Sequence, residues 1–205
     1  MAFIPGQTDT KMADIPAFLI YVIVTTFTPG PNNILSMVNA MRYGYRKVHS
    51  FLVGVFVGFF IVLLLSAFAN LVLVNFIPKA ENWLKILGAV YMIFLAIHIL
   101  LTKPAREDSD RKGMNTFTVG FSQQFLNLKG ILYGITIYAT FIIPAYRQPI
   151  ILALFALVLA LAGYLSVNLW ALTGSWLQNL AWRYQRWINL GMGILLIYSA
   201  VISLI

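Results

Sequence analysis

Long apolar stretches alternate with short polar segments along the whole chain. A stretch of about 20 apolar residues is long enough for a helix that crosses the hydrocarbon core of a bilayer. On this pattern we predict six membrane-spanning helices, near residues 14–41, 48–74, 84–101, 115–142, 150–173 and 187–204. The first and fourth are too long for one straight span and carry polar clusters at their middles, so we predict that each is broken into two half-helices. The expected fold is an all-α, polytopic membrane protein.

The composition agrees with this class. Of the 205 residues, 60% are hydrophobic and only 10% are charged, and the mean hydropathy is +0.85. A water-soluble domain carries roughly a quarter of charged residues. The net charge of +8 is read as loop residues that anchor and orient the spans, so no nucleic acid partner is expected. Without cysteine, and with few His and carboxylates, the chain gives no indication of a metal site or a cofactor.

The longest hydrophilic segment, residues 102–114, divides the membrane region into two halves. We predict one transporter domain over residues 1–205, with a first repeat at about 14–101, a cytoplasmic linker at 102–114 and a second repeat at about 115–204. Each half has three predicted spans. Because three is an odd number, the second half must enter the membrane with inverted topology.

The basic residues are unequally divided between the two sides of the predicted membrane. One set of loops holds nine: Arg42, Arg46, Lys47, Lys103, Arg106, Arg111, Lys112, Arg183 and Arg186. The opposite set holds four: Lys11, Lys79, Lys85 and Arg147. Basic loops stay on the cytoplasmic side, so both termini are expected outside the cytoplasm. The amino terminus lacks the charge pattern of a cleavable signal, and the first span is expected to be retained.

The interruption of the first span is the most informative segment. It consists of Thr28, Pro29, Gly30, Pro31, Asn32 and Asn33. Proline removes a backbone donor, and irregular backbone at membrane depth needs other hydrogen-bond partners. Pro31 suits the first position of a new helix, whose free amides, at Asn32, Asn33 and Ile34, would then form a positive end suited to a carboxylate. We therefore expect these residues to bind a substrate.

The fourth span is interrupted at the matching position in the second half. Gln123, Gln124 and Asn127 supply amide groups there, and Lys129 brings a charge near the bilayer centre. A charged side chain at that depth costs several kcal/mol and marks a functional site by default. Matching interruptions in inverted repeats indicate a midplane substrate site. The alternative that Lys129 only pairs with backbone carbonyls as a structural lock stays open.

Two motifs resemble those of a known family. Residues 28–35 read Thr-Pro-Gly-Pro-Asn-Asn-Ile-Leu, and residues 124–134 read Gln-Phe-Leu-Asn-Leu-Lys-Gly-Ile-Leu-Tyr-Gly. With six predicted spans, the chain resembles the LysE/RhtB family of amino acid exporters over nearly its whole length, and looks most like the branch that exports cysteine and O-acetylserine. The residues that resemble that branch are 131–134, 140–141, 170–174 and 184–186. The family commonly has proline between the Asn and Lys of the fourth span, where this chain has Leu128. A gentler second break is expected.

The resemblance implies export of small amino acids or their derivatives across a bacterial inner membrane, driven by the proton motive force, with no enzymatic activity. The absence of an acidic residue near the proposed site favours neutral substrates. The main alternative is a channel or uniporter for small polar solutes; an intramembrane enzyme and a non-transporting subunit are weaker alternatives.

The residue that carries the proton is not evident from the sequence. Acidic residues usually do this in transporters, and no carboxylate lies within the predicted hydrocarbon region. The candidates are Asp14, Lys129 and His98. Gly54 and Gly58, four residues apart, suit helix packing within the chain or a homodimer contact.

Overall fold

The computed structural model describes residues 15–72, 77–101 and 115–202, and these residues are almost entirely helical. The α-helices are α1 (Ile15–Phe27), α2 (Pro31–Tyr43), α3 (Tyr45–Val72), α4 (Ile77–Leu101), α5 (Phe117–Ser122), α6 (Leu128–Ile137), α7 (Pro149–Trp176) and α8 (Gln178–Ile202). A 3₁₀ turn, η1 (Gln123–Phe125), follows α5, and a π-helical turn, η2 (Tyr138–Ile142), continues α6. The all-α prediction is confirmed.

Two described helices, α3 and α7, are each long and apolar enough to cross a membrane. A third span results if residues 117–125 and 128–142, which meet at an angle of 59°, are counted as one bent helix. The remaining apolar helices, Ile15–Phe27, Ala89–Leu101 and Arg186–Val201, are shorter than a full span. They correspond to parts of the first, third and sixth predicted spans.

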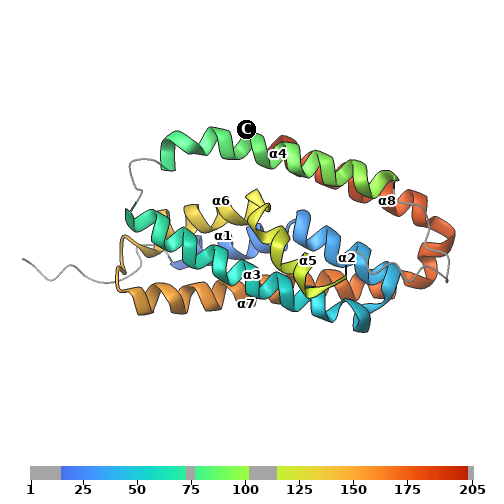
Figure 1. Cartoon of the computed structure of the whole chain (residues 1–205), viewed down its shortest axis with the longest axis horizontal. Coiled ribbons are helices and arrows are strands. Elements are labelled where there is room, and N and C mark those ends of the chain that lie inside the picture. The colour runs from blue at the N-terminus through green and yellow to red at the C-terminus, as the bar shows by residue number, and fades with distance from the viewer. Residues whose placement is uncertain (1–14, 73–76, 102–114, 203–205) are drawn as a thin grey trace, which may run out of the picture.

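Both interruptions lie midway along the bundle. Figure 1 shows α1 and α2 end to end along the long axis, with α6 and α5 end to end beside them. Helices α4 and α8 pack against each other and form a separate layer along one face of the other helices (Figure 1).

Three glycines bring α3 and α5 into backbone contact. A Cβ at Gly54 would collide with the carbonyl of Phe117, and one at Gly120 with the carbonyl of Phe51. Gly58 lies in the same way against Phe121. Small residues allow such close approach in membrane helices. The Gly54 face of α3 is therefore buried within the chain, and of our two alternatives for these glycines, packing within the chain is confirmed.

The buried apolar residues form two main clusters, one on each side of the interruptions. One cluster joins α2 to the first half of α3, the second half of α7 and parts of α4 and α8. The other joins α1 and α6 to the second half of α3 and the first half of α7. The interrupted backbone lies between these two buried clusters. Polar groups there can contact water only if the protein provides a cavity.

Candidate functional site

The first interruption separates α1 from α2 by three residues. Pro31 occupies the first turn of α2, and Gly30 precedes it with an extended backbone, φ −173° and ψ 175°. The amide of Ile34 donates to the Gly30 carbonyl at 2.9 Å. The predicted helix start at Pro31 is confirmed, but Ile34 is not one of the free amides. Only Asn32 and Asn33 can present amides at this end of α2.

Asn33 satisfies the carbonyl groups at the end of α1. Its Nδ2 donates to the carbonyls of Thr26 and Thr28, each at 2.9 Å. Its Oδ1 accepts from the hydroxyl of Ser166 on α7 at 3.1 Å, and that hydroxyl also lies 3.0 Å from the Thr26 carbonyl. Asn33 is 4% exposed, so water could not replace these bonds without a structural change.

Helices α7 and α8 satisfy two more of these carbonyls. Trp170 Nε1 donates to the Phe27 carbonyl at 3.3 Å, and the Ser199 hydroxyl donates to the Pro29 carbonyl at 3.0 Å. Each carbonyl from residue 26 to residue 29 therefore accepts a side-chain hydrogen bond. This is the condition for irregular backbone inside a membrane protein.

Lys129 supplies the charge at this end of α1. Its Nζ lies 3.1 Å from the Thr28 carbonyl, 2.9 Å from the Thr28 hydroxyl and 3.1 Å from the Pro29 carbonyl. An ammonium group has three protons, and these oxygens can accept all of them. The carboxyl end of a helix also favours a cation. The side chain passes so close to Gly30 that a Cβ there would lie 2.8 Å from Lys129 Cδ.

The second interruption is ended by Asn127, which caps α6. Its Oδ1 accepts from the Gly130 amide at 3.4 Å. Gln124, 1% exposed, joins this interruption to the first: Asn32 Nδ2 donates to Gln124 Oε1 at 2.8 Å, and Gln124 Nε2 donates to Asn32 Oδ1 at 3.1 Å and to the Gly120 carbonyl at 2.9 Å. The two interruptions are directly bonded.

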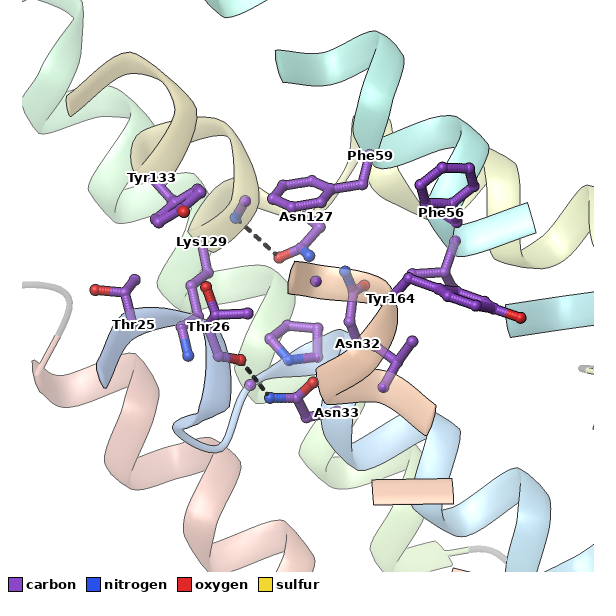
Figure 2. Close-up of a pocket in the computed structure, with 16 residues that line it drawn as sticks. Thr25, Thr26, Asn32, Asn33, Phe56, Phe59, Asn127, Lys129, Tyr133 and Tyr164 are labelled. Atoms are coloured by element: carbon purple, nitrogen blue, oxygen red, sulfur yellow. Dashed lines mark hydrogen bonds between the residues drawn. The ribbon is translucent and has the colours of Figure 1, made fainter. Parts of the chain in front are cut away.

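A small cavity of about 50 Å³, which we call the first cavity, lies where the interruptions meet (Figure 2). One water molecule needs a cavity volume of about 10–15 Å³, so a small polar solute would fit tightly in the first cavity. The predicted site residues Gly30, Pro31, Asn32, Asn33, Asn127 and Lys129 line it. Of its described lining residues, only Lys129 is charged.

The other predicted site residues lie elsewhere. Thr28 and Pro29 line a neighbouring, larger cavity. Gln123 and Gln124 line neither cavity: Gln124 holds Asn32, and Gln123 Nε2 is 3.5 Å from Asn32 Oδ1.

The three proton-carrier candidates differ in their position relative to the two cavities. Lys129 lines both cavities, whereas His98 is exposed on α4 and lines neither. Asp14 lies outside the described residues.

Aromatic side chains form much of the first cavity, and our sequence analysis missed them. Phe56 and Phe59 come from α3, Tyr133 from α6 and Tyr164 from α7 (Figure 2). Phe56 packs on Tyr164 with ring centroids 5.5 Å apart, and Phe59 on Tyr133 at 6.0 Å. Their helices are apolar on all sides, so no periodic pattern marked the inward face.

The Tyr133 hydroxyl is an exception among the buried polar groups. The side chain is only 4% exposed, and its hydroxyl makes no hydrogen bond to the part of the chain that the structure describes. Thr26 lies close by, without hydrogen-bond geometry. Buried hydroxyls are normally paired, so this one is available to a ligand or a water molecule.

Comparison with known proteins assigns the family. The family model described as LysE type translocator matches residues 23–205. This range includes both interruptions and every lining residue of the first cavity. The chain belongs to the LysE family. It is therefore a membrane protein of a transporter family rather than an enzyme.

Relatives within the family are similar over nearly their whole length. The cysteine/O-acetylserine efflux proteins of Escherichia coli (strain K12) and Shigella flexneri serotype 5b (strain 8401) are each 37% identical to this LysE-type chain over 187 residues, which are 91% of this chain and 95% of each relative. The same holds for the protein of that description from Escherichia coli O139:H28. No solved structure matches the chain.

Proposed function

We propose that this protein exports small neutral amino acids, or derivatives such as O-acetylserine, from the cytoplasm across the bacterial inner membrane. The observation that carries the proposal is the first cavity, where two interrupted helices meet around a single charged side chain. The relation to cysteine/O-acetylserine efflux proteins supports the substrate class.

The groups around the first cavity suit a zwitterion. The amides of Asn32 and Asn33 at the start of α2, together with the Lys129 ammonium, favour a carboxylate. The Asn127 carboxamide and the aromatic faces of Phe59 and Tyr133 can receive an ammonium group. The small volume and the absence of acidic lining residues disfavour long cationic substrates.

We further propose six spans in two inverted repeats, with α1–α2 and α5–α6 as the broken first and fourth spans. In support, the two halves pack on each other in matching pairs: α2 on α7, α5 and α6 on α3, and α4 on α8. Alternating access would follow if the halves rock around the interruptions. Both termini would lie on the periplasmic side, as the distribution of basic residues favours.

Export against a gradient requires coupling to another ion. A neutral zwitterion carries no net charge, so the membrane potential alone cannot drive it. All six carboxylates of the chain, at residues 9, 14, 81, 107, 108 and 110, lie outside residues 15–72 and 115–202, which form both interrupted helices and the first cavity. Among the three candidates, Lys129 is the one placed at the site, and we propose it as the proton-coupled group.

Uptake of labelled cysteine into inside-out vesicles tests this function. We expect uptake that collapses when a protonophore is added, and that is lost in Asn33→Ala and Lys129→Met variants present at the parent level. Vesicles that equilibrate cysteine regardless of protonophore would indicate a uniporter or channel instead. If both variants transport and bind like the parent, the assignment of the site is wrong.

A further inference from the structure

A second, larger cavity of about 430 Å³ lies beside the first, between the α4–α8 layer and the helices α1 and α6. More than half of its lining residues carry a hydroxyl group, among them Thr28, Thr136 and Ser199. These hydroxyl groups provide donors and acceptors for water and for a hydrated solute, beside apolar side chains such as Leu132 and Leu195. The proposed function makes no use of this cavity.

Three residues line both cavities: Thr25, Lys129 and Tyr133. They form the wall between the two spaces. Lys129 is tied to the carbonyls of Thr28 and Pro29, and the Tyr133 hydroxyl has no partner among the described residues. If a solute passes the wall, the Lys129 ammonium must exchange its hydrogen-bond partners. The Tyr133 hydroxyl can bond the solute without breaking another hydrogen bond to the described residues.

The cavities occupy opposite sides of this wall. The first is lined by α3 and α7 near residues 55–59 and 163–167, and it touches both buried clusters, through Val55 of the cluster that includes α2 and Phe59 of the cluster that includes α1. The second is lined by α1 before its end, by α6 after its start, and by α8 at residues 195–199. In the orientation proposed above, residues 195–199 lie near the periplasmic end of α8, which ends at Ile202, so the second cavity reaches toward the periplasm.

We infer that the second cavity is the exit compartment of the transport path, a water-filled site that receives the amino acid zwitterion after it passes the wall formed by Thr25, Lys129 and Tyr133. The inference rests on the proposed function and extends it by a second substrate position. The substrate carboxylate would replace the Thr28 and Pro29 carbonyls at Lys129, and the Tyr133 hydroxyl would bond the substrate on either side of the wall.

Single cysteines can test this inference directly, because the chain has no cysteine of its own. Thr136 lines only the second cavity, whereas Val24, 55% exposed, lines neither and serves as the matched control. In intact cells, a charged methanethiosulfonate reagent should modify Thr136→Cys at least about tenfold faster than Val24→Cys, because the reactive thiolate forms only in contact with water. O-acetylserine should slow the reaction; cysteine is unsuitable because its thiol consumes the reagent.

Modification of the folded Thr136→Cys protein should also stop export, and Thr136→Trp should stop export while O-acetylserine still raises the apparent melting temperature. Val24→Trp should export normally. Equal, slow labelling of both cysteines, or unimpaired export after complete modification at residue 136, would overturn the inference and point to a lipid-filled gap. If the parent protein neither exports O-acetylserine nor is stabilised by it, the proposed function is wrong as well. This outcome differs from a failure of the inference alone, in which the parent protein still exports.

Discussion

The side chains of Asn32 and Gln124 exchange two hydrogen bonds, of 2.8 and 3.1 Å, between residues 92 positions apart in the chain. Each belongs to one of the two helix interruptions. Gln124 is almost fully buried and also donates to the Gly120 carbonyl. This pair therefore holds the two interruptions in register and orients the start of α2 toward the first cavity.

A double-mutant cycle on this pair measures the connection. Asn32→Ala and Gln124→Ala should each lower the apparent melting temperature in detergent, because each leaves the other amide without the two hydrogen bonds of the pair, at a cost of about 1–3 kcal/mol. The double variant should lose less than the sum of the single losses, with a coupling of about 0.5–3 kcal/mol. Strict additivity would show that the two amides do not depend on each other.

Replacement of Lys129 separates charge from packing. Lys129→Met keeps the apolar stem beside Gly30 but leaves the Thr28 and Pro29 carbonyls without their cation. We expect export to fall by at least about tenfold, since a charge held at this depth is functional by default. Measurement of labelled cysteine export, normalised to protein level, checks this. Normal export would favour the structural-lock interpretation of Lys129.

Tyr133→Phe removes a hydroxyl that has no partner among the described residues. Loss of an unpaired buried group should leave the melting temperature unchanged or slightly raised. Export and the stabilisation by O-acetylserine should nevertheless decrease, because the substrate loses a hydrogen bond. A drop in stability with unchanged transport would mean that the hydroxyl has a structural role only.

Glycine contacts give a prediction about packing alone. Gly120→Ala would drive a methyl group into the Phe51 carbonyl, and overpacking of this kind costs about 1–3 kcal/mol. Gly191→Ala is the matched control, since a Cβ at that position meets nothing within 4 Å. The first variant should melt at a lower temperature than the parent and the second should not. Equal melting temperatures would contradict the close α3–α5 contact.

The interruptions could be predicted from sequence because proline and polar side chains stand out in an apolar stretch. Pro31 marked the start of α2, and Asn127 and Lys129 marked the second interruption. The partners of these residues could not be predicted, since they depend on which helices are neighbours. Gln124 illustrates the difference: its polarity indicated the site, but the structure shows it bonded to Asn32 rather than lining a cavity.

The aromatic lining of the first cavity could not be predicted for a related reason. In a water-soluble helix, polar residues reveal which face is buried, whereas α3 and α7 are apolar on both the lipid-facing and the inward sides. Phe56 and Tyr164 therefore looked like any other span residue. Likewise, Gly54 was compatible with a dimer contact until the position of α5 was known.

Counterflow in proteoliposomes tests the central claim most directly. Purified parent protein, reconstituted with unlabelled O-acetylserine inside, should accumulate labelled cysteine from outside, and Asn33→Ala and Lys129→Met should not. The account is contradicted if the parent protein shows no more counterflow than empty liposomes, or if both variants accumulate cysteine at the parent rate.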